Sequence, residues 1–128
     1  MEAFLNSCRS AGITPVENSL TCDAVVIWSV LWNGRMSKNK SIYNHYRSLN
    51  KPVIIIDVGA LNRNVTWKIA INNITSEGYY GHTENLNYDR PNHLGIKLCA
   101  AVKGEKILLA GQHSKSLQWE GMPDLENY

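Results

Sequence analysis

Residue types with obvious chemistry stand directly after the apolar segments of this chain. Asp57 follows the apolar run 53–56, and Gly59 comes two residues later. A carboxylate at the carboxyl end of a strand is well placed to act as a general base or to bind a hydroxyl group. Asp also favours turns, so Asp57 could equally cap the turn that follows. Gly59 permits either a sharp turn or the close approach of a ligand to the backbone.

Three other segments carry candidate ligand-binding residues. Arg35 follows the apolar run 23–32, and its planar guanidinium suits a phosphate or a carboxylate. The Gly-rich stretch 75–95 suits a loop that binds a sugar or a base by stacking and hydrogen bonding, or a surface loop held by tyrosine packing. Its candidate residues are Tyr79, Tyr80, His82, Tyr88, Arg90 and His93.

The third segment is GQHSKS at 111–116, which follows the apolar run 107–110. Backbone N–H groups of a Gly/Ser loop next to a lysine can hold a phosphate where a helix begins. The spacing of a P-loop is absent. The candidate ligand-binding residues here are Gln112, His113, Ser114 and Lys115.

Composition narrows the classes of function. The chain has 128 residues, enough for one domain, and its net charge of +2 includes no block of like charge that would require nucleic acid or a membrane. The three cysteines, Cys8, Cys22 and Cys99, show no metal-like spacing, so we expect no disulfide framework, no metal site and no cofactor. We expect Cys22 and Cys99 to be inert core residues. Without a signal peptide, or an apolar run near the roughly 20 residues of a membrane helix, we expect a cytoplasmic protein.

A strand, a helix and a second strand are predicted in the first half of the chain. Residues 23–32 and 51–58 are almost continuously apolar, which is typical of parallel strands buried on both faces. Between them, residues 38–50 place apolar side chains at helical spacing, with Ser37 as the expected N-cap. These elements form one right-handed βαβ unit.

The remaining elements are less strongly marked. We expect a helix at 1–12 ending at Gly12, a short edge strand at 13–17, a strand in preference to a helix at 64–74, either a strand or a short helix at 96–102, and a strand at 104–111. The order of elements predicts an α/β fold, a small Rossmann-like three-layer domain with a mostly parallel sheet. Ligands of such sheets bind at the carboxyl ends of the strands, which selects the loops after Trp32, Ile56 and Ala110.

Three stretches resemble glycosyltransferase-like proteins of the two-Rossmann (GT-B) type, including those carried by bacteriophages. They are DAVVIWSVLWNGRM, KPVIIIDVGALNRNVTWKIAINNI and ILLAGQHSKSLQW, and the resemblance covers most of residues 10–120. It includes no catalytic motif that can be transferred residue by residue. It implies that residues 1–104 form the N-terminal, acceptor-side domain and that residues 105–128 begin a second, donor-binding domain that is missing.

The resemblance implies a first hypothesis for function. An acceptor, either a sugar or a modified nucleobase, would bind at the carboxyl ends of the strands, with a nucleotide sugar as donor and Asp57 as base. Arg63, His82, Arg90 and His93 would orient the acceptor or a phosphate. The domain would be incomplete as a catalyst alone, and a homodimer would rebuild the cleft.

Two other classes of function fit the same residues. A non-catalytic protein would use the same cleft to sequester a nucleotide or another small molecule, or to dock on a host protein. A structural or assembly role is the third class.

Overall fold

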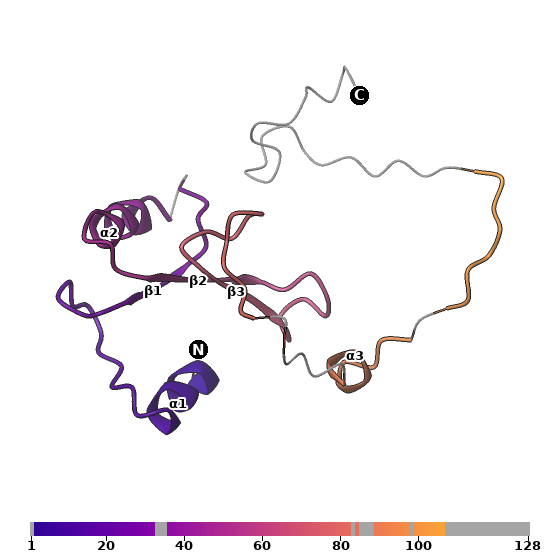
Figure 1. The fold of residues 1–128 in the computed structure, drawn as a ribbon, viewed down its shortest axis with the longest axis horizontal. Coiled ribbons are helices and arrows are strands. Elements are labelled where there is room, and N and C mark those ends of the chain that lie inside the picture. The colour runs from indigo at the N-terminus through magenta and orange to yellow at the C-terminus, as the bar shows by residue number, and fades with distance from the viewer. Residues whose placement is uncertain (1, 33–35, 83, 85–88, 98, 107–128) are drawn as a thin grey trace, which may run out of the picture.

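The chain folds as a small α/β domain in the computed structural model, which describes residues 2–32, 36–82, 84, 89–97 and 99–106 (Figure 1). Within these described residues, a helix is followed by a strand, a second helix, two further strands and a single-turn helix. These elements are α1 (Glu2–Ser10), β1 (Val25–Trp28), α2 (Ser37–Ser48), β2 (Val53–Val58), β3 (Trp67–Ile71) and α3 (Arg90–His93).

The described strands form one mixed sheet in the order β1-β2-β3. β1 and β2 run parallel, with Val25 opposite Val53 and Trp28 opposite Ile56. β3 runs antiparallel to β2, so the expectation of a mostly parallel sheet is wrong for this pair. Residues 59–66 explain the difference, because a connection this short returns the chain antiparallel, whereas a parallel strand needs a crossover of about a dozen residues or more.

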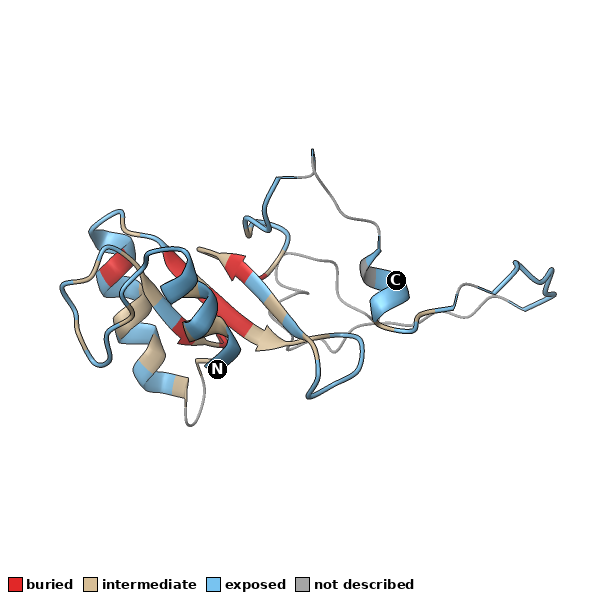
Figure 2. Ribbon diagram, turned by 90° about the horizontal axis from the view of Figure 1, so that it is seen from below, coloured by how far each residue is buried: buried red, intermediate tan, exposed pale blue. Residues whose placement is uncertain are grey.

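The core lies between one face of the sheet and α2. Alternate strand residues point to this face, and Ile27, Val53, Ile55 and Ala70 are buried there. Tyr46 of α2 is fully buried against them, and its hydroxyl donates a hydrogen bond to the carbonyl oxygen of Ser19 at 3.2 Å. Figure 2 shows the buried residues concentrated on the strands and the adjoining helix.

The opposite face of the sheet carries the other set of strand residues, all of them apolar. Val26, Trp67 and Ile69 remain exposed on it, and Trp28 and Trp67 meet edge to face with ring centroids 5.3 Å apart. Figure 1 shows α2 on one side of the sheet and α1 on the other. α1 contains no buried residue, and it leaves Val26, Trp67 and Ile69 of this face exposed.

Several predicted elements are confirmed. The first helix, the βαβ unit and the strand expected within 64–74 are all present, although β1 ends at Trp28 instead of continuing to Trp32. Gly12 has φ +75° just after α1, a conformation that suits glycine at the end of a helix.

Three local expectations are wrong. Ser37 is the first helical residue of α2, and the N-cap is Met36, without a side-chain hydrogen bond. Residues 13–17 form no strand, and Ile13 and Val16 lie exposed. The described residues within 96–102 form neither a strand nor a helix, because their side chains find little to pack against and are mostly exposed. Most of the strand expected at 104–111, and most of the second domain expected at 105–128, lie outside the described residues.

None of the helices in the described part of the chain has the length and apolar character needed to cross a membrane.

Candidate functional site

Asp57 stands at the carboxyl end of the parallel strand pair, as predicted. Val58 is the last residue of β2, and β1 ends at Trp28, opposite Ile56. Ser29 follows Trp28 and Asp57 follows Ile56, so the parallel register brings Ser29 beside Asp57. The Ser29 hydroxyl donates a hydrogen bond to Asp57 Oδ2 at 3.2 Å, and the backbone N–H of Val58 donates to Oδ1 at 2.7 Å. Each carboxylate oxygen thus has one donor, and the plane of the carboxylate is held from two sides.

Ser29 is the residue that sequence reasoning missed. It is the only polar residue buried among the described part of the chain, with 2% of its surface exposed. Its φ of 58° is unusual for a residue other than glycine, and such strain persists only where the surroundings impose it. Its N–H donates to the Ile56 carbonyl at 2.8 Å, and its Oγ accepts from the N–H of Leu31 at 3.3 Å. The signal in the sequence was a single serine within an otherwise apolar run.

Lys68 is the basic residue that the sheet register places next to Asp57. The two residues are Cα partners across β2 and β3. The Lys68 ammonium donates a hydrogen bond to the Ile74 carbonyl at 2.7 Å and lies 5.2 Å from the centre of the Tyr80 ring. Its charge is therefore directed toward the segment that follows β3. Lys68 was not among the predicted site residues, because its place beside Asp57 depends on the antiparallel pairing of β2 and β3, whereas a mostly parallel sheet was expected.

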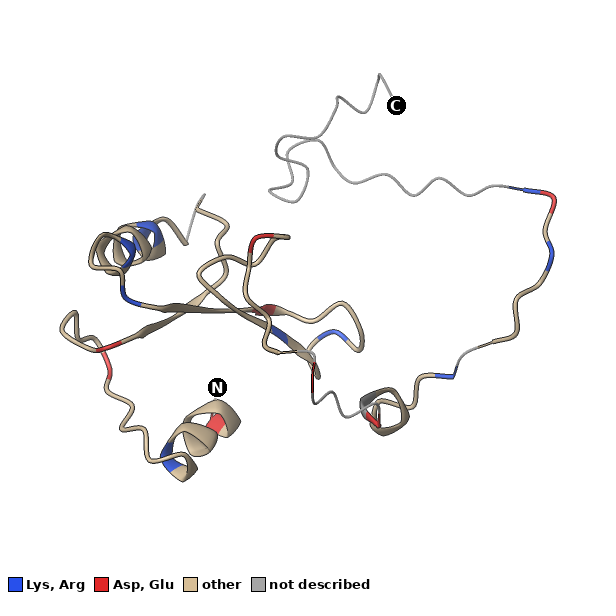
Figure 3. Cartoon of the chain, viewed as in Figure 1, with Lys and Arg blue, Asp and Glu red and all other residues tan. Residues whose placement is uncertain are grey.

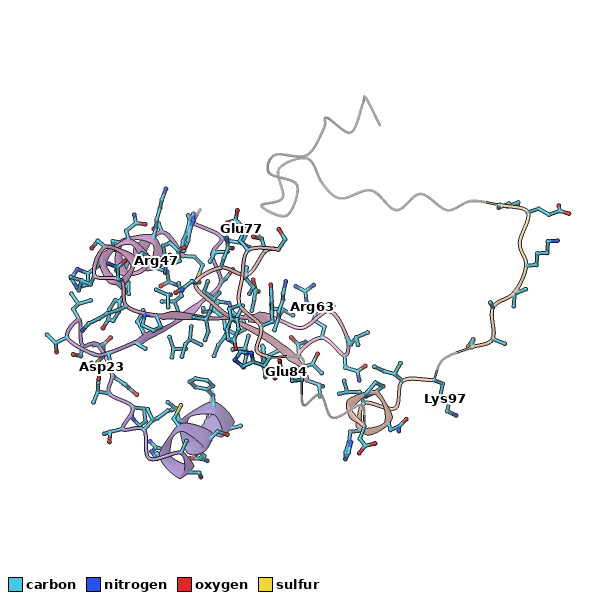
Figure 4. The ribbon with its side chains drawn as sticks, viewed as in Figure 1. Asp23, Arg47, Arg63, Glu77, Glu84 and Lys97 are labelled. Carbon is cyan, nitrogen blue, oxygen red and sulfur yellow. The ribbon has the colours of Figure 1, made fainter. Side chains whose placement is uncertain are left out.

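Gly59 and Arg63 belong to the loop 59–66 that follows Asp57. The Gly59 N–H donates to the Thr66 carbonyl at 3.0 Å, and a Cβ at Gly59 would lie 2.6 Å from that same oxygen. The close approach that glycine permits here is thus an approach of the chain to itself. Arg63 is exposed, and Figure 4 labels it on this loop. Asn62 and Asn64, on either side of it, both have positive φ.

The described parts of the stretch 75–95 are held by local contacts. The Tyr80 hydroxyl donates its one hydrogen to the Ile74 carbonyl and also lies 3.1 Å from the Thr75 carbonyl oxygen, and Tyr79 bridges to Ile71 at the end of β3. These contacts tie Tyr79 and Tyr80 to the end of β3 and the residues after it, while both side chains stay about half exposed. Tyr88 lies outside the described residues.

The two histidines of this stretch are exposed and make contacts within their own segments. His82 meets the Tyr79 ring at 5.6 Å between centroids, edge to face. His93 is the last residue of α3, and its Nδ1 lies 2.9 Å from the Asp89 carbonyl oxygen. Neither contact joins a histidine to Asp57.

The side chains of the other predicted site residues lie outside the described part of the structure. Arg90 begins α3, but its side chain is outside the described part. Five further candidates also lie outside the described residues: Arg35, Gln112, His113, Ser114 and Lys115.

Charge and cysteine placement add little to the site. Figure 3 shows basic residues on α2, and residues of both signs on α1, the sheet and the loops. The described residues hold no group of three or more His, Cys, Asp or Glu side chains that could bind a metal. Cys8, Cys22 and Cys99 are free thiols. Cys22 packs against the core as expected, whereas Cys99 is exposed, so its predicted burial is wrong because the segment around it joins no element.

Comparisons of the chain with models of protein families, with curated proteins and with solved structures found no match. A function must therefore be inferred from the geometry around Asp57.

Proposed function

We propose that this domain is the acceptor-side part of a glycosyltransferase-like protein, and that Asp57 is its general base. The observation that carries the proposal is the position of the Asp57 carboxylate at the carboxyl ends of β1 and β2, oriented by Ser29 and the Val58 N–H. Ligands of open α/β sheets bind at these ends. The presence of α1 and α2 on opposite sides of the sheet supports a Rossmann-like three-layer domain.

The chemistry proposed for Asp57 is removal of one proton. The acceptor hydroxyl gives its proton to the carboxylate as its oxygen forms a bond to the anomeric carbon of the nucleotide sugar. The bond between that carbon and the phosphate oxygen breaks, and the nucleotide leaves with the electron pair. Each carboxylate oxygen already accepts one hydrogen bond and has a second lone pair for the acceptor hydroxyl.

The exposed residues around the site would orient the substrates. Arg63 follows Asp57 on the loop 59–66, where its guanidinium suits a phosphate. We assign the same role to Arg90, and His82 and His93 would donate hydrogen bonds to the acceptor. The acceptor is a sugar or a modified nucleobase, the cell compartment is the cytoplasm of a phage-infected cell, and a homodimer would complete the cleft.

The test compares Asp57→Asn with Asp23→Asn. Asp23 is exposed and lies before β1, at the opposite end of the parallel pair, and Figure 4 labels it there. A panel of nucleotide sugars and acceptors is screened by thermal shift, because a ligand that binds the folded state raises the melting temperature. Product formation with the stabilising ligands is then measured by mass spectrometry. We expect Asp57→Asn to lose about 10²- to 10⁴-fold in turnover while keeping the thermal shift, and Asp23→Asn to retain both. Unchanged turnover in Asp57→Asn would show that Asp57 is not the base.

A second candidate function is binding without catalysis. It is favoured by the engagement of both Asp57 oxygens and of the Lys68 ammonium, since a fixed carboxylate can bind a ligand hydroxyl without removing its proton. Here the ligand would be a nucleotide or another small molecule that the protein sequesters. A thermal shift with nucleotides or nucleotide sugars, abolished in Asp57→Asn and accompanied by no product, would support this function over glycosyl transfer.

A further inference from the structure

The helix α1 has one apolar side and one polar side. Phe4, Leu5 and Cys8 share the apolar side, and all three are partly buried. Asn6 and Ser10 lie on the opposite side and are exposed. The helix has only nine residues, and isolated helices shorter than about 12–15 residues are marginal in water. Such a helix is stabilised mainly by packing its apolar side on another element, so α1 needs an apolar surface.

The face of the sheet opposite α2 offers such a surface, and we call it the open face. Its exposed apolar residues are Val26, Trp67 and Ile69, with 38%, 42% and 44% of their surfaces accessible. Figure 1 shows α1 on this side of the sheet, and Figure 2 views the molecule from that side, with α1 between the viewer and the sheet. An apolar helix side and an apolar sheet face therefore lie on the same side of one chain, although no residue of α1 is buried.

The connection between α1 and β1 is free next to the helix and fixed next to the strand. Residues 14–18 make no hydrogen bond within the described part of the chain. The residues after them are anchored, since the Ser19 carbonyl accepts from the Tyr46 hydroxyl and the Cys22 carbonyl accepts from the Lys51 ammonium at 2.7 Å. The free segment spans up to about 17 Å when extended. The distance between α1 and the sheet can thus change while the start of β1 stays in place.

We propose that α1 is a lid that closes on the open face of its own chain. In the closed state Phe4, Leu5 and Cys8 pack against Val26 and Ile69, and both apolar surfaces leave water together. The structure shows the open state, in which the sheet residues are accessible. The occupant of the face is α1 because α1 already lies on this side, has a matching apolar side, and is joined to β1 by a segment long enough to allow closure.

The lid is separate from the proposed function. Asp57 alternates with Ile55 along β2, so its side chain leaves the sheet on the same side as the core packed against α2. The lid closes on the opposite side. Loss of the lid therefore leaves the groups that hold Asp57 in place, and failure of either proposal does not imply failure of the other.

The first test is disulfide trapping with the native thiol of α1. Cys8 is combined in turn with Val26→Cys and Ile69→Cys, in a complete chain that carries Cys22→Ala and Cys99→Ser, and a thermal melt checks that this background folds. The control moves the thiol to the polar side of α1 by Cys8→Ser with Asn6→Cys. A disulfide requires Cβ atoms within about 4.5 Å, so Cys8 should form an intramolecular disulfide with at least one partner several-fold faster than the control.

Three outcomes of the trapping experiment would overturn the lid. They are no disulfide with Cys8, equal rates for Cys8 and for the Asn6→Cys control, and a disulfide formed only between two chains. The last outcome would assign the open face to α1 of a second copy.

The second test is a double-mutant cycle followed by thermal unfolding. Phe4→Ala favours the helical state of α1, so a lower melting temperature must come from lost packing. We expect Phe4→Ala to lower the melting temperature by several degrees, and Asn6→Ala, on the polar side, to leave it unchanged or raise it.

Phe4→Ala is then combined with Val26→Ala and, separately, with Ile69→Ala. If the lid closes, at least one double variant should lose less than the sum of its two single losses, because residues in contact are coupled. Additive losses in both pairs would refute the packing of α1 on the open face. Neither test depends on turnover.

Discussion

Asn72 joins the end of β3 to the start of β2, and its replacement provides a quantitative test of the fold. Its backbone N–H donates to the Val53 carbonyl at 2.7 Å, and its side-chain Oδ1 accepts from the Val53 N–H at 3.1 Å. Its own carbonyl accepts from the Tyr43 hydroxyl at 2.8 Å. The φ of Asn72 is 68°, which asparagine tolerates better than most residues.

Two contributions set the size of the expected effect. Asn72→Ala removes the acceptor of the Val53 N–H, and because Val53 is fully buried, leaving that donor unpaired costs about 1–3 kcal/mol. Alanine at a positive φ adds about 1–2 kcal/mol. We therefore expect Asn72→Ala to lower the free energy of unfolding by about 2–5 kcal/mol. Asn72→Gly relieves the backbone strain and should lose less, and Asn72→Asp keeps the acceptor and should stay within about 1 kcal/mol of the original protein.

The free energy of unfolding of the three variants is measured by urea unfolding, followed by circular dichroism. The slope of this free energy against urea concentration should be the same in all of them. Asn44→Ala is the control, because Asn44 is exposed on α2 and its loss should change stability by about 0.5 kcal/mol or less. We expect the free energy of unfolding to be lowest for Asn72→Ala, higher for Asn72→Gly and highest for Asn72→Asp. If Asn72→Asp were as unstable as Asn72→Ala, the Oδ1 hydrogen bond would not be what stabilises this junction.

Two further predictions concern the core and the loop 59–66. Burial raises the pKa of Tyr46 above its ordinary value of 10.0, so above pH 10 the unfolded chain loses a proton that the folded protein keeps. The contribution of this group to stability is complete below pH 10 and is lost as pH rises through the folded pKa. Tyr46→Phe should lower the free energy of unfolding by about 1 kcal/mol at pH 7. The difference in this free energy between the variant and the original protein, measured by urea unfolding, should shrink between pH 9 and 11. A difference that grows with pH would contradict a raised pKa of Tyr46. Gly59→Ala should lower the melting temperature by several degrees because its Cβ would lie 2.6 Å from the Thr66 carbonyl oxygen, whereas Gly104→Ala, whose nearest contact would be at 4.0 Å, should change it little in the same thermal melt.

The parts of the fold that could be predicted from the sequence are those with a strong local pattern. The apolar runs around Ile27 and Ile55, separated by a helical spacing that includes Tyr46, predict a strand, a helix and a strand, and the structure has them parallel as expected. Asp57 could be placed at the rim because it directly follows such a run.

Two features of the site were missed for different reasons. The residues of β3 favour a strand, and the short connection 59–66 indicates an antiparallel pair, so the expectation of a mostly parallel sheet overlooked a signal that the sequence contains and with it the position of Lys68 beside Asp57. The contact of Ser29 with Asp57 depends on the positive φ of Ser29, which no residue pattern indicates.

The parallel pairing of β1 with β2 is what makes a site at Asp57 physically reasonable. Ser29 follows the last residue of β1 and Asp57 is next to last in β2, and the two side chains meet only because both strands end at the same rim. If β1 ran antiparallel to β2, the segment after Trp28 would leave the sheet beside Val53, at the end of β2 that is distant from the Asp57 carboxylate. β3 runs antiparallel to β2, so the carboxyl end of β3 and Asn72 lie beside Val53, at the start of β2. Replacements at Asn72 should therefore affect stability without altering the groups that hold Asp57, because the two residues lie at opposite ends of β2.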